Sequence, residues 1–366
     1  MSKPKIVSIF SGVGGIDFGF EKAGFQTVFA SDIWNRACES LQENFPDCEV
    51  VCDDIINIDF KKIKESHYEI DGLVGGPPCP PFSKSRFYRK EKERGIDDMD
   101  GFTTVSNYFR AVEELKPKFF FFENVHGFVY KPHRAALELV EEESERLGYK
   151  IFHQVVNAAD FGVAQTRQRF ICIGVKKNLE DFKYPKPTHS DPNKTRKETL
   201  SWVTCEDVIG DIDFDWPEDE KMQAGSKHKD LLKLVPPGDN YLYFTKERGY
   251  PNPIFKWRSR YWSFLLKLSP GRPSWTIQAS HSNNMGPFHW KNRFLRIQEI
   301  KRIQSFDDGH IFLGNYREQW RQVGNAVPPK LAYSFAKQIK QQYFKNNEHQ
   351  EYSDSEPIRL EVSTYR

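Results

Sequence analysis

Short apolar runs alternate with amphipathic segments along the first 180 residues of the chain. Residues 5–10 (KIVSIF) form an apolar run with β-branched side chains, and Ile16, Phe20 and Ala23 then recur at helical spacing before Gly24. Further strands are predicted at residues 28–31, 70–74, 118–122, 151–156 and 169–175. Further helices are predicted from the apolar sets Cys38, Leu41, Phe45; Val105, Tyr108, Val112, Leu115; and Ala136, Leu139, Val140, Leu147.

This alternation of strands and helices predicts an α/β fold. Strands that are separated by helices indicate a Rossmann-like, mostly parallel sheet with helices on both of its faces. The predicted strands at 151–156 and 169–175 lie close together in the sequence, so we expect them to form an antiparallel pair at one end of the sheet.

The regular pattern stops near residue 180, where Pro, Lys, Asp and Glu become frequent. We therefore predict one domain at residues 1–180 that is completed by residues 286–345, and a second, smaller, irregular domain at residues 181–285. The polar residues 346–366 are predicted to form a C-terminal tail. A last helix is expected from Pro328-Pro329 onward, because proline is well tolerated in the first turn of a helix.

The composition of the 366 residues narrows the class of protein. The formal net charge of +2 is too small to indicate a nucleic-acid binder by itself, so any site for a polyanion must be a local patch. Six cysteines occur without a CxxC pair, which favours reduced thiols over a zinc site or a disulfide framework. The absence of a long apolar run or an apolar signal region leads us to expect a soluble, cytoplasmic protein.

A glycine-rich turn at residues 10–15 (FSGVGG) follows the first strand and opens a helix. Glycines let the backbone approach a ligand closely, and a helix N-terminus offers free N–H groups. Asp32 ends the next strand, where a carboxylate can bind ribose hydroxyls. Such a turn binds NAD, FAD, another nucleotide or S-adenosylmethionine, or it is only a structural turn.

Cys79 and Glu123 each follow a predicted strand. Prolines on both sides of Cys79 (77–81, PPCPP) restrict the backbone and hold the thiol at the carboxyl end of a strand. The alternative is a buried, inert cysteine. Glu123 follows four phenylalanines, which favours the rim of a pocket, where it could act as a general acid beside Cys79. An ordinary surface glutamate is the alternative.

Residues 165–169 (QTRQR) carry two arginines that are two positions apart. On an extended segment Arg167 and Arg169 would point the same way. Two guanidinium groups on one face suit a phosphate, a carbonyl oxygen or a carboxylate. A solvated edge strand explains the pattern equally well.

Taken in order, these segments resemble the DNA cytosine-5 methyltransferase family of the bacterial restriction–modification type. The resemblance covers most of residues 5–340, weakens inside 181–270, and extends to 157–169 (NAADFGVAQTRQR), 293–306 (with Glu299, Arg302 and Gln304) and 322–328 (QVGNAVP). It implies the S-adenosylmethionine-dependent methyltransferase fold, with 181–285 as the target-recognition domain. Pro80 stands where the family usually has Gln, which is a departure in a loop that contacts DNA.

The resemblance also implies how the reaction proceeds. Cys79 would add to carbon 6 of cytosine, Glu123 would act at ring N3, Arg169 would hold O2, and Arg167 would orient Cys79 or the backbone. The implied cofactor is S-adenosylmethionine, which leaves as S-adenosylhomocysteine, and no metal is needed. The implied cofactor-binding residues are Phe10, Ser11, Gly12, Gly14, Gly15, Asp32, Ile33, Asp54, Ile55, Pro78, Asn325 and Val327.

A cytosine inside duplex DNA must leave the helix before both faces of its ring can be reached. Residues 83–102 are rich in Lys and Arg, and we expect a mobile loop there that closes over the flipped base and grips phosphates. Residues 256–262 interleave aromatic and basic residues and are the best candidate for sequence readout, unless those aromatics form a core. The predicted DNA contacts are Ser83, Arg86, Arg89, Arg258 and Arg260.

Three other functions remain open at this point. An RNA cytosine-5 methyltransferase that acts on tRNA shares these motifs, although the 181–285 segment is large enough for a DNA-recognition domain. A non-catalytic DNA-binding relative would leave the retained Cys79 and Glu123 without a role. A nucleotide-binding oxidoreductase would leave the same residues unexplained. The expected partners are duplex DNA and a cognate restriction endonuclease, with no membrane.

Overall fold

The structure is a computed structural model that describes residues 2–78, 99–194, 198–216, 224–258, 261–280 and 282–344. Among these residues, no helix combines the length and the apolar character that a membrane span requires.

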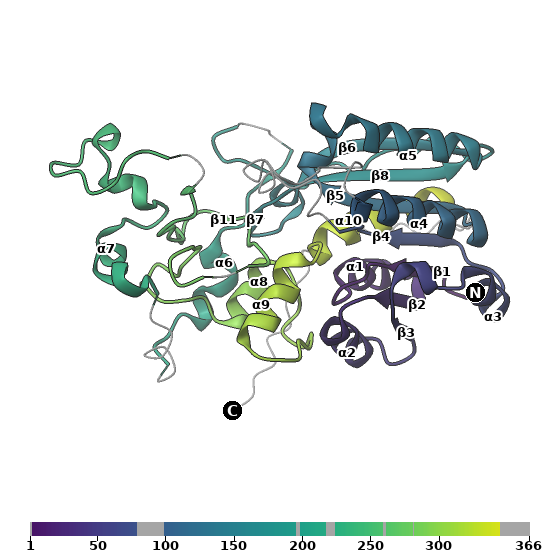
Figure 1. Cartoon of the computed structure of the whole chain (residues 1–366), viewed down its shortest axis with the longest axis horizontal. Coiled ribbons are helices and arrows are strands. Elements are labelled where there is room, and N and C mark those ends of the chain that lie inside the picture. Colours follow the sequence, from purple (N-terminus) through teal and green to yellow (C-terminus); the bar gives the residue numbers. More distant parts are fainter. Residues whose placement is uncertain are drawn as a thin grey trace.

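A seven-stranded sheet forms the centre of one half of the molecule (Figure 1). Its strand order is β3-β2-β1-β4-β5-β8-β6. The first five strands in this order pair in parallel, and β8 runs antiparallel to both β5 and β6. The antiparallel pair of β6 and β8 is the one that the sequence predicts. The strands are β1 (Lys5–Ile9), β2 (Gln26–Asp32), β3 (Glu49–Cys52), β4 (Gly72–Gly75), β5 (Phe119–Val125), β6 (Tyr149–Asn157) and β8 (Gln168–Lys176).

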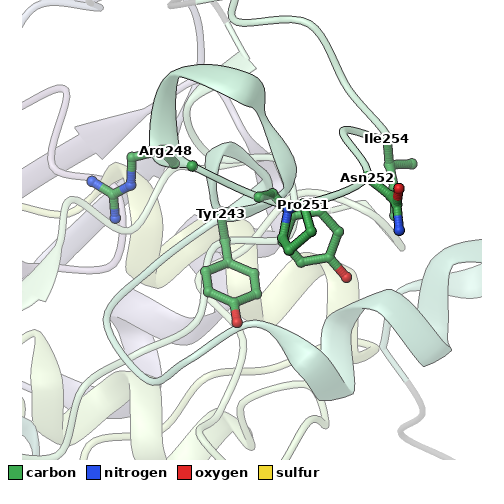
Figure 2. Close-up of a pocket in the computed structure, with 7 residues that line it drawn as sticks. Tyr243, Arg248, Pro251, Asn252 and Ile254 are labelled. Atoms are coloured by element: carbon green, nitrogen blue, oxygen red, sulfur yellow. The ribbon is translucent and has the colours of Figure 1, made fainter.

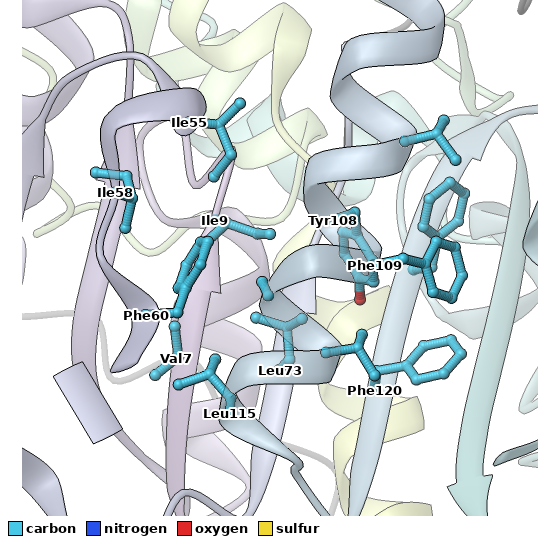
Figure 3. Packing of buried hydrophobic residues seen from close by; sticks show 14 of the residues in the cluster. Val7, Ile9, Ile55, Ile58, Phe60, Leu73, Tyr108, Phe109, Leu115 and Phe120 are labelled. Atoms are coloured by element: carbon cyan, nitrogen blue, oxygen red, sulfur yellow. The ribbon is translucent and has the colours of Figure 1, made fainter. Parts of the chain in front are cut away.

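Helices cover both faces of this sheet. One face carries α3, α4 and α5, whose apolar side chains pack on residues such as Val7, Leu73 and Phe120 (Figure 3). The other face carries α1 and α10, where Phe20 and Phe335 pack against Phe121. These helices are α1 (Gly15–Lys22), α3 (Phe60–His67), α4 (Met99–Leu115), α5 (Arg134–Arg146) and α10 (Pro329–Tyr343), and α2 (Asn35–Asn44) lies beside β3.

Four consecutive phenylalanines in β5 explain how the sheet is buried on both sides. Successive side chains of a strand point to opposite faces. Phe120 and Phe122 accordingly belong to the core on the α4 side, and Phe119 and Phe121 belong to the core on the α10 side. All four side chains are fully buried, so an uninterrupted apolar run is required here.

Two elements of this half escape the sequence pattern. The edge strand β3 is short, and each of its side chains is at least partly exposed, so it lacks an apolar signal. Helix α3 buries only Phe60 and Ile63, while the Asp59 side chain accepts a hydrogen bond from Lys62 N at its start. Helix α3 is therefore stabilised by its N-cap and by packing on the sheet, and its pattern of apolar residues does not predict it.

The other half of the molecule consists of short elements joined by long irregular segments (Figure 1). Its core contains Leu232, Tyr241, Phe244, Leu265 and Phe288. The short strands and helices are β7 (Gln165–Thr166), β9 (His189–Ser190), β10 (Leu200–Ser201), α6 (Cys205–Ile209), α7 (Lys229–Leu234), β11 (Ser274–Trp275), α8 (Ile297–Ile303) and α9 (Tyr316–Asn325). The described 3-10 helices are η1 (Ile55–Asn57), η5 (His126–Val129), η6 (Lys131–His133), η7 (Ala158–Phe161), η8 (Gly210–Ile212), η10 (Ser226–His228), η11 (Tyr241–Phe244) and η12 (Lys246–Arg248).

A third cluster of buried side chains joins the two halves. It combines Val13 of the glycine-rich turn with Cys205 of α6, Ile300 of α8 and Trp320 of α9. The cluster thus combines residues from before and after residue 285, where the sequence predicts a domain boundary. This boundary stays a prediction.

Candidate active site and cofactor pocket

The glycine-rich turn after β1 is held by Asp32 at the end of β2. The Asp32 carboxylate accepts hydrogen bonds from the backbone N–H groups of Gly12 (2.8 Å) and Trp34 (2.9 Å). Burial raises the pKa of Asp32, and these donated hydrogen bonds act in the opposite direction. Gly12 has a φ of +56°, and a Cβ at this residue would meet nothing within 4 Å. The turn therefore leaves open space beside its backbone, which suits a nucleoside-type cofactor.

The rest of the turn is fixed by residues on both sides of it. Phe10 has a φ of +54°, Ser11 N donates to Ser31 O (3.0 Å), and Gly14 N donates to Ser11 O (2.9 Å). Gly15 begins α1, and a Cβ there would lie 2.3 Å from the carbonyl oxygen of Val327. The predicted first and last cofactor segments are thus in direct contact, although 312 positions (327 minus 15) separate Gly15 from Val327.

A buried histidine supports the same turn and was not found from the sequence. His310 lies 3.0 Å through Nε2 from the carbonyl oxygen of Val13. Burial lowers the pKa of His310 to about 4, so the ring is neutral near pH 7 and its N–H can donate to this carbonyl. Phe306 and Phe312 enclose the ring.

Two other predicted cofactor positions lie at the ends of β2 and β3. Ile33 follows Asp32 and exposes 70% of its surface, so its apolar side chain is available to a ligand. Asp54 caps η1 by accepting a hydrogen bond from Ile56 N (3.1 Å). The Ile55 side chain is buried in the core (Figure 3), and Arg110 donates to its carbonyl oxygen (2.6 Å). The Ile55 side chain therefore points into the protein, which the sequence does not reveal.

Glu123 and Arg169 form a buried ion pair on neighbouring strands. Arg169 Nε lies 2.8 Å from Glu123 Oε1, and both side chains are almost fully buried. Burial raises the pKa of Glu123, against the lowering influence of Arg169 and Arg167. The sequence analysis places Glu123 after the strand, at a pocket rim, whereas β5 continues to Val125 and the acid lies inside it.

The segment that leads to residue 79 lies against this acid. A Cβ on Gly76 would be 2.8 Å from Glu123 Oε2, so only a glycine fits there without moving the carboxyl group. The Asn124 side chain donates to the carbonyl oxygen of Pro77 (3.3 Å), and Pro78 is exposed. Residues 76–78 are therefore held beside Glu123 immediately before Cys79.

Arg167 binds backbone rather than a neighbouring acid. Its guanidinium donates to the carbonyl oxygens of Ile277 (3.0 Å), Gly324 (2.9 Å) and Ala326 (3.1 Å). The side chain is 2% exposed. The resemblance gives Arg167 one of two roles, to orient Cys79 or to orient the backbone. These contacts match the second role. Arg167 and Arg169 thus bind different groups, although on an extended segment they are expected to point the same way.

Two buried glutamines extend this network and had not been singled out as site residues. Gln304 donates to the carbonyl oxygen of Ala326 (2.6 Å) and accepts a hydrogen bond from the Gln165 side chain. Gln165 in turn accepts a hydrogen bond from Ile277 N (3.1 Å). The network fixes the segment that carries the last two predicted cofactor residues, the exposed Asn325 and the buried Val327.

The predicted DNA contacts are only partly covered by the described residues. Cys79, Ser83, Arg86, Arg89 and Arg260 lie outside them. Arg258 is exposed, and the Tyr241 hydroxyl holds its backbone by donating to Arg258 O (2.6 Å) and accepting from Arg258 N (2.9 Å). Trp257 and Tyr261 expose 47% and 40% of their surfaces. These two aromatics are therefore not core residues, which the sequence had left open.

An open pocket of about 510 Å³ lies next to this segment (Figure 2). Arg248 and Asn252 lie at opposite ends of the pocket, with Tyr243 and Pro251 between them. Arg and Asn side chains can read base edges, so the lining suits a role in sequence readout. Across the described part of the chain, no cluster of His, Cys, Asp and Glu side chains could hold a metal ion.

Comparison with known proteins decides the family. The family model for C-5 cytosine-specific DNA methylase matches residues 4–341. The chain belongs to this family. The methylase therefore transfers a methyl group from S-adenosylmethionine to carbon 5 of cytosine in DNA, and the resemblance seen in the sequence is confirmed.

Curated relatives and solved structures agree with this assignment. The chain is 35% identical to the Type II methyltransferase M.SacI of Streptomyces achromogenes, with 89% of this chain and 90% of the relative covered. It is 33% identical to the Type II methyltransferase M.NgoFVII of Neisseria gonorrhoeae, with coverage of 92% and 87%. The structure of S. pombe Dnmt2 methyltransferase shares the fold, with a TM-score of 0.64, 14% identity, and coverage of 93% of this chain and 100% of that one.

Proposed function

We propose that this methylase is the modification enzyme of a Type II restriction–modification system. It would methylate cytosine within one specific duplex sequence and protect that sequence from a cognate restriction endonuclease. The match to Type II methyltransferases over almost their whole length supports this role. Because its substrate would be the chromosomal DNA of a bacterium, we place the enzyme in the cytoplasm.

The observation that carries the proposed mechanism is the buried pair of Glu123 and Arg169 beside residues 76–78. We propose that the Cys79 thiolate adds to carbon 6 of the cytosine, which makes carbon 5 nucleophilic. Glu123 would hold a proton at ring N3, and its raised pKa favours that protonated form. Arg169 would hold the cytosine O2. After carbon 5 has taken the methyl group, its proton would pass to water, and the bond between the Cys79 sulfur and carbon 6 would break to release the thiolate.

The cofactor site proposed here uses the turn at residues 10–15 and the ends of β2 and β3. When bound, S-adenosylmethionine supplies an electrophilic methyl group. Asp32 would bind the ribose, Ile33 would pack on the adenine, and the open backbone at Gly12 would face the amino-acid part. Asp54, Asn325 and Val327 would complete the pocket. The reaction needs a thiol, an acid and two cations, and we propose that it uses no metal.

The DNA contacts also remain a proposal. Ser83, Arg86 and Arg89 would grip the strand around the flipped cytosine, and Arg258 and Arg260 would read or hold the target sequence. The two hydrogen bonds from Tyr241 that fix the Arg258 backbone support this assignment, because a side chain that recognises a base must start from a fixed position.

The test is transfer of a tritiated methyl group from S-adenosylmethionine to mixed-sequence duplex DNA and to tRNA, with Cys79→Ser beside the wild type. We expect label on carbon 5 of DNA cytosine with the wild type, and none with Cys79→Ser. Label on tRNA alone would replace the proposed substrate by RNA. Tight DNA binding without any label would show that the protein is a non-catalytic DNA-binding relative. Protection of the labelled site from a restriction endonuclease would support the modification role.

A further inference from the structure

Trp275 is a large exposed side chain attached to the catalytic segment. It lies in β11, which pairs in parallel with β7, and it is the register partner of Thr166, directly before Arg167. The indole exposes 49% of its surface, whereas the preceding Ser274 is buried. The strand pair therefore presents an aromatic ring to solvent next to the predicted active-site arginines.

Hydrogen bonds fix β11 to this segment on both sides of the indole. The Thr166 hydroxyl donates to Ser274 O (3.1 Å), and the Thr276 hydroxyl donates to Thr166 O (2.8 Å). Arg167 donates to Ile277 O (3.0 Å). The position of Trp275 is thus coupled to that of Arg167 by short-range contacts, so a group bound to the indole is held relative to the catalytic segment.

A second tryptophan braces the first. The rings of Trp262 and Trp275 meet edge to face, with centroids 5.2 Å apart. Trp262 ends the segment that interleaves aromatic and basic residues, and the Asn240 side chain holds its carbonyl oxygen. Lys256 and Arg258 of the same segment are exposed. The two indoles therefore connect a basic recognition segment with the active-site strand.

We propose that Trp275, braced by Trp262, is a positioning residue that stacks on a nucleobase next to the target cytosine and stabilises DNA from which that cytosine has been flipped out. This inference rests on the proposed function. DNA is the occupant because it is the methylase's substrate, and because the exposed Trp275 lies on the active-site strand pair while Trp262 ends a segment with the exposed cations Lys256 and Arg258. The free energy of stacking a base on an aromatic ring is comparable with the free energy that flipping a base costs.

The experiment compares two duplexes that carry the mapped methylation site, one with the target cytosine paired to guanine and one with it opposite an abasic position. The second cytosine is already unpaired, so its flipping costs less. We expect Trp275→Ala to lower kcat/KM roughly tenfold on the paired duplex and much less on the abasic duplex. Trp275→Phe keeps an aromatic face and is expected to retain most of the activity.

Tyr68→Ala is the control, because Tyr68 is an exposed aromatic residue between α3 and β4, outside the segments predicted to contact DNA. An equal loss with Tyr68→Ala and Trp275→Ala, or an equal loss on both duplexes, would overturn the proposal. Unchanged activity of Trp275→Ala on both duplexes would also overturn it, provided that the wild type methylates DNA. Absence of methylation by the wild type would instead refute the proposed function. Cofactor binding and thermal unfolding of each variant are measured to separate stacking from folding.

Discussion

The protonation of Glu123 is set by two opposing influences at the scale of single residues. Burial favours the neutral acid and raises its pKa, while Arg169 at 2.8 Å favours the carboxylate and lowers it. Burial helps an acid that must hold a proton for cytosine N3. The Arg169 cation helps to keep the same acid ordered inside an apolar sheet. The arginine therefore both places the carboxyl group and limits the pH range in which it is protonated.

Removal of the Arg169 cation tests this balance. With Arg169→Gln the lowering influence is lost, so the pKa of Glu123 rises further and the acid stays protonated to higher pH. We expect the alkaline limb of the kcat/KM profile to move to higher pH, together with a loss of roughly 100-fold at the optimum. Arg169→Lys keeps a cation and is expected to move the limb less. A limb that moves to lower pH would contradict the assignment of Glu123 as the acid.

Gly76 offers a second test at this scale, because it probes the position of Glu123 without changing its chemistry. A methyl group at Gly76 would lie 2.8 Å from Glu123 Oε2, so Gly76→Ala must displace the carboxyl group. We expect single-turnover methylation to slow by about 10- to 100-fold, since small misplacements of reacting groups have effects of this size. Cofactor affinity, measured by calorimetry, is expected to stay within about twofold. A normal methylation rate would mean that Glu123 is not at the reacting ring.

At the scale of elements, the site depends on contacts between segments that each look unremarkable in the sequence. The segment 165–169 pairs with β11 and contacts the end of α9. Arg167 binds backbone after β11 and at the end of α9, Gln165 binds backbone after β11, and Gln304 binds backbone after α9. These buried donors and acceptors satisfy one another, so the loss of one leaves several unsatisfied.

Gln304 is the sharpest probe of this network. Gln304→Met keeps the side-chain length but leaves Gln165 and the Ala326 carbonyl without this partner, at a cost of about 1–3 kcal/mol. We expect a lower denaturation midpoint in urea and weaker cofactor binding, because Ala326 precedes Val327 at the glycine-rich turn. Gln304→Ala adds a cavity and is expected to cost more. Wild-type stability of the Met variant would show that packing alone holds the segment.

Whether a site residue can be predicted depends on how far along the sequence its contacts lie. The turn at 10–15 and Asp32 could be predicted because they lie at strand ends, which mark sites in an α/β sheet. Glu123 could be predicted because it is an acid directly after four phenylalanines, although it lies inside β5. His310 could not, because it acts on Val13, 297 residues away, and a lone histidine among aromatics carries no local signal. Ile55 stays a predicted cofactor residue. Its side chain enters the core, and the sequence does not reveal this because one apolar residue does not indicate its direction.

At the scale of the whole molecule, segments near the two ends of the described chain meet beside the glycine-rich turn. Helix α10 packs against α1 on one face of the sheet, and residues 326–327 meet Gly15 at the start of α1. The cluster around Val13 then links the same turn to α6, α8 and α9. If residues 181–285 bind DNA and the turn at residues 10–15 binds the cofactor, as proposed, this shared packing would link the two binding sites.

Gly15→Ala tests this coupling, because its methyl group would lie 2.3 Å from the Val327 carbonyl oxygen and must push the two ends of the chain apart. Backbone cannot yield as a flexible side chain can, so we expect a loss of about 1–3 kcal/mol in unfolding free energy. Cofactor affinity is expected to fall with it. Gly271→Ala is the control, since its methyl group would meet nothing within 4 Å, and it is expected to leave both quantities unchanged. If Gly15→Ala loses stability but binds cofactor and DNA like the wild type, the contact between residues 15 and 327 serves folding alone. If the affinities for cofactor and DNA fall together, the contact also links the two binding sites.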